Sequence, residues 1–449
     1  MRIKKNGEKE EMVVKVSAYK GMRDFLPEDM LKRNFVISII KEVFENYGFE
    51  PIETPAIELW SVLSGKYGDE EKLLYKFKDR GEREVGLRYD LTVPLARFVA
   101  NHLHKLSRPF KRYQIQPVWR ADKPQKGRFR EFYQCDIDII GVNSLLADAE
   151  ILKILYSILK KLGFNDFIIN INSRKIFKIL VEYLQVDEQK EFLIARAIDK
   201  YDKLGIKGVR EQLEKTEFSE KEIEKILFLL EITGTNSEKI SKLDNIFEGL
   251  TTRKAFIEEI REILKYLDYF RVDEKHINFN PFLARGLDYY TGIISETTLT
   301  THKIGSITGG GRYDNLIGIF SGQKIPATGS SIGLERIITI MDELNMYPFE
   351  KKTEVEVLFA VQDEKLLEKT IFLTEELRKG GIKTELYLGK KDLRKQITYA
   401  LNKGISFMLI LGEDENLKGE ITLKNLTNRE QTRIKQENIS GYIRDLLNE

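Results

Sequence analysis

The alternation of hydrophobic and polar residues is clearest in the segment Phe110–Gly141. Two stretches there alternate with period two around a central KPQKG loop, which is the repeat of a strand whose two faces have different surroundings. We therefore predict an antiparallel hairpin. One face of its second strand carries Gln134, Asp136 and Asp138, while Cys135 lies on the apolar face. A sheet with one solvated face would explain this pattern, and so would a surface that binds a zwitterion and a polyphosphate.

The pattern on either side of the hairpin predicts a sheet flanked by helices. Apolar residues at helical spacing predict a helix over residues 27–47, and strand patterns dominate residues 73–140 apart from a helix near 93–104. Another helix is expected at 145–162, followed by a strand at 167–172.

Residues 174–271 have a different character. They are rich in Lys, Glu, Leu and Ile at helical spacing, and Ser219 with Glu222 has the spacing of a capping box. The strand pattern returns at residues 279–340. We interpret residues 174–271 as a helical insertion between two parts of one sheet domain.

The C-terminal part predicts a second domain. Strand and helix patterns alternate there, which is typical of a small α/β domain with a largely parallel sheet. The predicted strands are 355–361, 384–388, 407–411 and 420–423, and the predicted helices are 365–379, 392–403 and 441–447. The expected domains are a mobile charged tail (1–16), a sheet domain (17–344), a polar linker (345–353) and an α/β domain (354–449).

Composition excludes several kinds of protein. The 73 basic and 71 acidic residues give a net charge of only +2, so any site for a polyanion must be local. The one cysteine, Cys135, rules out a disulfide framework or a cysteine-based metal site within one chain. No apolar run is long enough to span a membrane, and residues 1–16 lack the apolar core of a secretory signal. We expect a cytoplasmic protein.

Two glycine-containing segments are candidates for ligand binding. Gly309–Gly311 can mark a tight turn or a place where the backbone approaches a ligand without side chains. Gly329–Gly333 leads into an apolar helix with Arg336 in its first turn. That guanidinium could hold a nucleotide phosphate, or it could lie at the surface.

Two further segments place charges in apolar surroundings. Arg285 and Asp288 interrupt an otherwise apolar and aromatic run, where they are costly to bury unless they are paired or bind a ligand. Asp90 and Thr92 follow a strand pattern at a turn, where Asp90 could bind a ligand or cap a helix. We expect a site at the first segment and leave both readings of the second open.

These segments together resemble the class II aminoacyl-tRNA synthetases. Gly48–Pro55, Val118–Phe132 and Gly329–Arg336 are similar to the three motifs of that class. Arg285–Tyr290 and Gly309–Asp314 are similar to segments characteristic of the histidyl-tRNA synthetase family. The resemblance extends from about residue 18 to the C-terminus.

The resemblance implies a fold and an activity. The fold would be α/β: an α+β catalytic domain on a mostly antiparallel sheet of six or seven strands with a helical insertion, followed by an anticodon-binding α/β domain. The activity would be ATP-dependent activation of L-histidine to histidyl-adenylate and its transfer to the 3′ end of tRNA(His). ATP with Mg²⁺, L-histidine and tRNA(His) would be the partners, the enzyme would be a homodimer, and no side-chain metal site is expected.

The resemblance also assigns roles to individual residues. The residues implied to bind histidine are Asp90, Thr92 and Gln134 at its α-ammonium, Asp138 and Tyr290 at its imidazole, and Tyr289 and Tyr313 in support. Arg120, Arg285 and Arg336 would surround the reacting phosphates, with Arg128 helping to bind ATP. Arginine suits this task because it stays charged and grips phosphate oxygens bidentately.

The sequence departs from the family pattern at three carboxylates. Asp122 stands where motif 2 usually has Glu, and Asp90 and Asp138 stand where bacterial members often have Glu. The alternative function is that of the non-catalytic paralogue that regulates ATP phosphoribosyltransferase. That paralogue typically lacks the last domain and has an eroded Arg285–Tyr290 segment, and both are present here. The intact arginines also argue against a domain that only senses uncharged tRNA.

Overall fold

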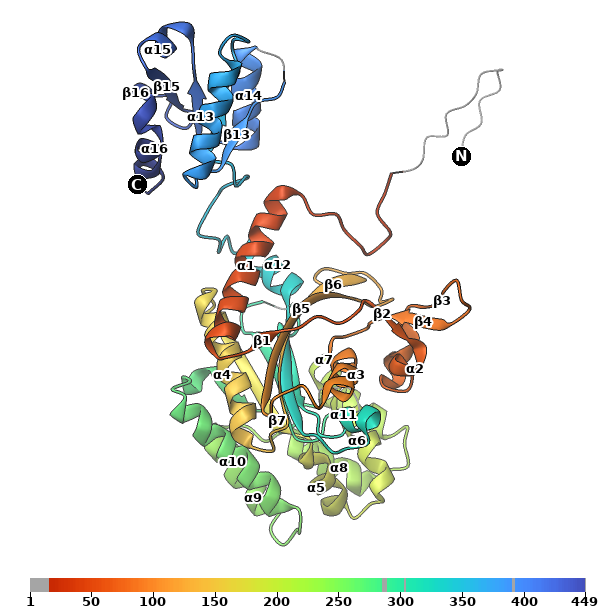
Figure 1. Cartoon of the computed structure of the whole chain (residues 1–449). Coiled ribbons are helices and arrows are strands. Elements are labelled where there is room, and N and C mark those ends of the chain that lie inside the picture. Colours follow the sequence, from red (N-terminus) through yellow and green to blue (C-terminus); the bar gives the residue numbers. More distant parts are fainter. Residues whose placement is uncertain (1–15, 285–288, 303, 390–391, 449) are drawn as a thin grey trace, which may run out of the picture. The chain divides into compact units, whose positions relative to one another are not determined.

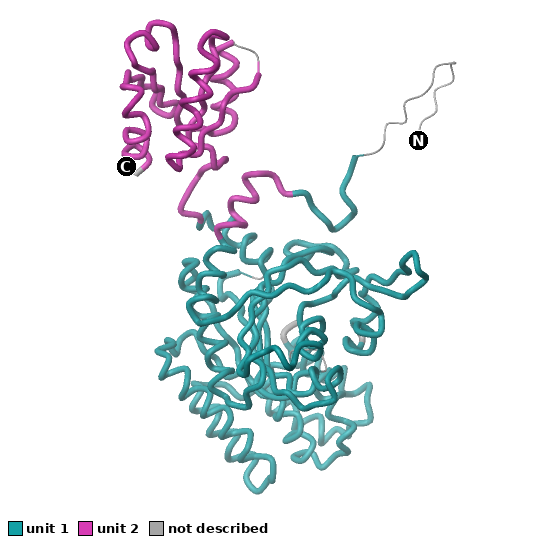
Figure 2. The backbone as a smooth tube through the Cα atoms, viewed as in Figure 1, with its two compact units in different colours: residues 1–24, 36–346 teal, residues 25–35, 347–449 magenta. Residues whose placement is uncertain are grey.

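The structure is a computed structural model that describes residues 16–284, 289–302, 304–389 and 392–448. The chain forms two compact units (Figure 2). The first contains Val36–Met346 together with the residues up to Asp24, and the second contains Phe25–Phe35 and Tyr347–Glu449. The helix α1 (Pro27–Asn46) begins in the second unit and ends in the first.

A mixed, mostly antiparallel sheet forms the centre of the first unit (Figure 1). Its strand order is β1-β5-β6-β11-β10-β9-β7-β8, with only β1/β5 and β7/β8 parallel. The bounds are β1 Glu50–Pro51, β5 Phe110–Trp119, β6 Glu131–Ile140, β7 Phe167–Ser173, β8 Ile277–Phe279, β9 Ile293–Leu299, β10 Thr308–Arg312 and β11 Ala327–Gly333. The described residues thus give eight strands rather than the expected six or seven, because the short edge strands β1 and β8 carry little periodicity.

The hairpin predicted at Phe110–Gly141 is confirmed, but its polar face is not solvated. Strands β5 and β6 pair in register, with Arg112 opposite Asp138. Arg112 is fully buried and Asp138 is 3% exposed. At this end of the hairpin, the apolar cluster that contains Phe110 also contains side chains of α3 (Thr92–His102) and α11 (Leu316–Ser321). The alternative of a wet sheet face was therefore wrong.

The glycine triplet lies in a strand rather than in a turn. Gly309–Gly311 forms the middle of β10, which pairs with β9 on one side and β11 on the other. A Cβ atom on Gly310 would lie 2.1 Å from the carbonyl oxygen of Gly329. The turn interpretation is therefore wrong, and the glycines serve close backbone approach within the sheet.

Helices cover the sheet and form the insertion. Helix α4 (Leu145–Lys161) packs on β6, β10 and β11, and α12 (Leu334–Glu343) packs on β6. The capping box predicted at Ser219 and Glu222 is present at the start of α8. The insertion helices are α5 Lys175–Leu184, α6 Glu191–Ile198, α7 Tyr201–Leu213, α8 Glu220–Leu230, α9 Asn236–Ile246 and α10 Arg253–Tyr269.

A smaller antiparallel sheet comes shortly before α3 in the chain. Its strands are β2 (Ile57–Leu59), β3 (Lys76–Lys78) and β4 (Glu84–Leu87), in the order β2-β4-β3. The short helices α2 (Trp60–Leu63) and η1 (Gly68–Leu73) connect β2 to β3.

The second unit contains a five-stranded sheet in the order β13-β12-β14-β15-β16. Its two parallel pairs, β12/β13 and β12/β14, are matched by two antiparallel pairs, so the expectation of a largely parallel sheet was only half right. Strand β16 was not predicted because its residues are polar and mostly exposed. The bounds are β12 Val357–Phe359, β13 Thr384–Leu386, β14 Phe407–Ile410, β15 Glu420–Asn425, β16 Gln431–Lys435, α13 Leu367–Lys379, α14 Leu393–Lys403, α15 Glu413–Leu417 and α16 Ile439–Asn448.

Candidate active site

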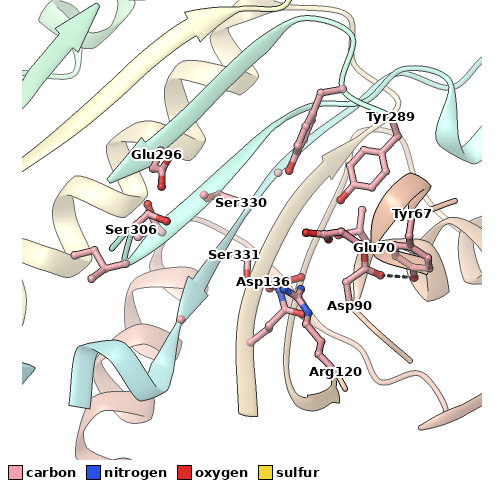
Figure 3. A pocket seen from close by; sticks show the side chains of 18 of the residues that line it. Tyr67, Glu70, Asp90, Arg120, Asp136, Tyr289, Glu296, Ser306, Ser330 and Ser331 are labelled. Carbon is pink, nitrogen blue, oxygen red and sulfur yellow. Dashed lines mark hydrogen bonds between the residues drawn. The ribbon is translucent and has the colours of Figure 1, made fainter. Parts of the chain in front are cut away.

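A cavity of about 760 Å³ opens on the polar face of the eight-stranded sheet (Figure 3). Segments far apart in the sequence meet there, because β6, β10 and β11 are neighbours in the sheet. The expected site residues that line it are Asp90, Thr92, Arg120, Arg128, Gln134, Asp138, Tyr289, Tyr290, Tyr313 and Arg336. Arg285 and Asp288 lie outside the described residues, although Ala284 and Tyr289, close to them on either side, line the same cavity.

Asp90 both caps a helix and faces the cavity. Its Oδ1 accepts hydrogen bonds from the Val93 backbone N–H and from the Tyr67 hydroxyl, each at 3.1 Å (Figure 3). Burial raises the pKa of Asp90. Within the described part of the chain, its Oδ2 has no hydrogen-bond partner. Both readings of Asp90 that the sequence left open are therefore compatible with the structure.

Gln134 presents a second acceptor to the cavity. Its Nε2 donates to the hydroxyl of Ser331 on β11 at 2.8 Å. Its Oε1 is buried and has no partner among the described residues. A buried acceptor without a donor is costly, so this end of the cavity suits a ligand with several N–H groups.

Asp138 lies over a glycine at the other end of the floor. A Cβ atom on Gly329, its cross-strand neighbour, would lie 2.0 Å from Asp138 Oδ1. The carboxylate is 2.5 Å from Arg112 and accepts a hydrogen bond from the Tyr313 hydroxyl. Burial raises its pKa to about 6, although Arg112 opposes the shift.

Arg112 is an important residue that sequence reasoning gave no role. It is fully buried, pairs with the Asp138 carboxylate and donates to Gln114 Oε1 at 3.4 Å. Gln114 in turn donates to the Thr54 hydroxyl at 2.9 Å. Only the register of β5 against β6 shows that Arg112 pairs with Asp138.

Arg120 is held at the wall of the cavity by Tyr89. Its Nε donates to the Tyr89 carbonyl at 3.0 Å, and its guanidinium lies 4.1 Å from the centre of the Tyr89 ring. The Phe132 ring lies 5.1 Å away on β6. These contacts fix the position of a permanent positive charge at the cavity wall.

The other two described arginines come from the hairpin loop and from α12. Arg128 donates through Nε to Asp122 at 2.9 Å, so the shorter carboxylate at position 122 still holds this arginine. Arg336, in the first turn of α12, donates to the carbonyl of Ser306. Arg120 and Arg128 thus reach the cavity from the β5–β6 hairpin, and Arg336 reaches it from α12.

Part of the cavity wall comes from the insertion and was not foreseen. Phe192, Ala195 and Arg196 of α6 line it, together with Lys200 just beyond that helix. Tyr67, from the segment before η1, was also missed as a lining residue. Neither contribution has a signal in the local sequence, because both depend on how distant segments pack.

Metal and membrane sites can be assessed only in the described residues. There, no group of three or more His, Cys, Asp or Glu side chains is arranged to hold a metal ion. The same residues include no helix with the length and apolarity needed to cross a lipid bilayer.

A mostly antiparallel sheet with arginines and carboxylates around one cavity, in a chain that also contains a separate α/β unit, is the arrangement expected of a class II aminoacyl-tRNA synthetase. Comparison with known proteins specifies the family. Residues 21–337 match the model of the histidyl-tRNA synthetase family, and residues 351–446 match that of the anticodon-binding domain. The chain belongs to the histidyl-tRNA synthetase family.

Individual relatives agree with this assignment. The histidine–tRNA ligase of Cytophaga hutchinsonii is 40% identical over 442 residues, which cover 94% of this chain and 97% of the relative. The crystal structure of histidyl-tRNA synthetase from Nostoc sp. PCC 7120 superposes with a TM-score of 0.85 at 31% identity, covering 96% of this chain and all of that one. A structure from Bacillus halodurans, described as an ATP phosphoribosyltransferase regulatory subunit/histidyl-tRNA synthetase, has a TM-score of 0.73 at 22% identity, covers 86% of this chain and 97% of that one, and shows the shared fold alone.

Proposed function

We propose that the cavity binds L-histidine and ATP side by side, with the amino acid over β6 and β11 and the phosphates towards Arg120 and Arg336. The chain is a ligase that activates histidine with ATP and transfers it to tRNA. Two buried acceptors that lack a partner among the described residues support this orientation of histidine. They are Asp90 Oδ2, just before α3, and Gln134 Oε1 on β6. An α-ammonium supplies the N–H donors that they lack.

The imidazole end follows from Asp138. Its carboxylate accepts an imidazole N–H, while the hydroxyl of Tyr290 pairs with the other ring nitrogen. Tyr313 and Tyr289 support this pocket, since Tyr313 donates to Asp138 and the Tyr289 ring lies 4.8 Å from that of Tyr290. A site built from such groups rejects amino acids that lack the matching ring nitrogens.

The phosphate end provides the catalysis. The histidine carboxylate attacks the α-phosphorus in line, a bond forms between the carboxylate oxygen and phosphorus, and the bond to pyrophosphate breaks. Both reactants are anionic, so catalysis consists mainly of positioning and charge neutralisation. Arg120 neutralises the α-phosphate and the attacking carboxylate, and Arg336 the γ-phosphate. Arg128 assists ATP binding, and Arg285 faces the α-phosphate by resemblance to the family.

Mg²⁺ enters this scheme with ATP. The described residues offer no cluster of side chains for a metal, so phosphate oxygens and water would supply most of its ligands. The ion would neutralise phosphate charge alongside the arginines.

Further parts of the proposal concern assembly and tRNA. We propose that the protein is a cytoplasmic homodimer. Exposed apolar side chains that could contribute to the dimer interface are Ile57 (50% exposed) and Leu59 (52%) of β2 and Phe77 (41%) of β3. The domain at 354–449 would bind the anticodon of tRNA(His), and residues 345–353 would link it to the catalytic domain. The tail expected at 1–16 lies, apart from Val16, outside the described residues.

Pyrophosphate exchange tests this function. The purified protein should exchange pyrophosphate into ATP only when L-histidine is present, and should charge tRNA(His). Arg120→Ala should lower the rate of exchange at least about 100-fold, with a much smaller change in histidine affinity, because the charge acts on the phosphates. Histidine binding without exchange by the unsubstituted protein would favour the regulatory paralogue instead.

A further inference from the structure

Asp136 lies in the middle of the cavity floor and has no role in the scheme above. It points to the same face of β6 as Gln134 and Asp138, two residues away on either side. Its cross-strand neighbour on β11 is Ser331 (Figure 3). Its side chain is 2% exposed and lines the cavity. It therefore lies between the proposed ammonium end and the proposed imidazole end.

One oxygen of this carboxylate is unsatisfied. The side chain interacts with the Ser331 hydroxyl, but Oδ1 has no hydrogen-bond partner within the described part of the chain. Burial raises the pKa of Asp136 to about 7, with Arg112 opposing the shift and Asp138 adding to it. Such a group is costly to keep in the interior unless a ligand donates to it.

The number of N–H donors on histidine indicates which of its groups would donate to Asp136. An α-ammonium has three N–H donors. Asp90 Oδ2 and Gln134 Oε1 supply two unpaired acceptors, and the Thr92 hydroxyl, which hydrogen-bonds to Tyr289, can offer the ammonium an uncharged oxygen but no compensating charge. Asp136 Oδ1 is an unpaired acceptor on the same face of the sheet as Gln134, and Asp90 is near enough to act on its charge.

The charges agree with this count. Asp138 already has Arg112 at 2.5 Å and the Tyr313 hydroxyl as partners. Asp136 forms no ion pair at contact distance among the described residues, and it lies near two other buried carboxylates, Asp90 and Asp138. A cationic substrate group therefore compensates Asp136 more than it compensates Asp138.

We propose that Asp136 binds the α-ammonium of histidine through Oδ1, as a third acceptor beside Asp90 and Gln134, an inference that rests on the proposed orientation of histidine. Asp136 is then a determinant of amino-acid binding. It makes the site reject imidazole compounds that have a carboxylate but no amine.

The test compares Asp136→Asn with Asp138→Asn, a matched change two residues along the same strand. Calorimetry measures the dissociation constants of L-histidine, L-histidinol and 3-(imidazol-4-yl)propionate, the last of which lacks the amine. Asp136→Asn should weaken the two amines at least about tenfold and change propionate binding less than about twofold. Asp138→Asn should weaken all three, because each has the imidazole.

Exchange kinetics give a second readout. Asp136→Asn should raise KM for L-histidine at least about tenfold while KM for ATP stays unchanged. Equal weakening of the three ligands, a parallel rise in both KM values, or an unchanged KM for histidine would each overturn the inference. Histidine-dependent exchange by the unsubstituted protein separates these outcomes from failure of the proposed function itself.

Discussion

The carboxylate of Asp138 occupies the space that a side chain at Gly329 would need. The two residues are cross-strand neighbours, and a Cβ atom on Gly329 would lie 2.5 Å from Asp138 Cγ and equally close to the carbonyl oxygen of Ile137. The backbone atom cannot move aside as a flexible side chain can. This glycine therefore allows a buried carboxylate to lie flat on the sheet, beneath the proposed imidazole.

The first prediction follows from this contact. Gly329→Ala should displace the Asp138 carboxylate, raise KM for histidine at least about tenfold and destabilise the protein by about 1–3 kcal/mol. Exchange kinetics and urea unfolding measure the two effects. Gly333→Ala on the same strand is the control for stability, since its nearest contact would be an ordinary 3.6 Å. Unchanged histidine binding in Gly329→Ala would refute the steric argument.

The second prediction concerns the hydroxyl of Tyr67. It donates to Asp90 Oδ1, and without it Asp90 retains only the Val93 N–H on that oxygen. Tyr67→Phe should raise KM for histidine at least about tenfold, since a hydrogen bond to a charged group contributes about 1.5–3 kcal/mol, with KM for ATP unchanged. Tyr89→Phe is the control, because that hydroxyl donates to Glu70 instead. An equal effect of both substitutions would argue against a specific role of Tyr67.

The third prediction is a pH dependence of stability in the ligand-free protein. A carboxyl whose pKa is higher in the folded state than in the unfolded state binds its proton more tightly when folded, so stability falls as the pH rises between the two values. For Asp136 these values are 3.8 and about 7, with Arg112, Asp138, Asp90 and Ser331 acting on its side chain. Asp136→Asn removes this loss.

The measurement is the free energy of unfolding of both proteins at pH 4.5 and pH 8, roughly the two ends of this window. The advantage of Asp136→Asn should grow with pH by an amount on the order of 2–4 kcal/mol, at about 1.36 kcal/mol per pKa unit. A difference between the two proteins that does not change with pH would contradict the buried, uncompensated carboxylate.

The fourth prediction concerns the structural ion pair between Arg312 and Asp148. This arginine, in the segment resembling the family, faces away from the cavity and donates through Nε to both oxygens of the buried Asp148 of α4, at 3.2 and 3.1 Å. Arg312→Met should cost about 3–5 kcal/mol of unfolding free energy, because it leaves Asp148 buried and unpaired. The double substitution with Asp148→Leu should recover much of that loss. Urea unfolding measures both, and a double variant no more stable than the single one would refute this role.

The sequence predicted the elements better than their surroundings. Period-two alternation placed Asp136 and Asp138 correctly on one polar face, but it could not show that α3 and α11, distant in the sequence, cover one end of that face. Three consecutive glycines favour a turn locally, yet pairing with β9 and β11 keeps Gly309–Gly311 extended. Tertiary pairing, rather than local preference, decided both cases.

In the candidate site too, local sequence identified some residues, while others became evident only from tertiary contacts. Motif resemblance identified residues such as Asp90 and Arg120, whose segments are recognisable one at a time. It did not identify Tyr67, Arg112 or Asp136 as part of the site, because their importance depends on strand register and on contacts across the cavity. The α6 wall was missed for the same reason.

The most direct test of the account is a crystal structure of the protein with L-histidine and a non-hydrolysable ATP analogue. We predict the α-ammonium within hydrogen-bond distance of Asp90 and Gln134, the imidazole against Asp138, and the α-phosphate against Arg120. Histidine bound in the opposite direction, with its imidazole at Asp90, or phosphates bound away from Arg120 and Arg336, would contradict it.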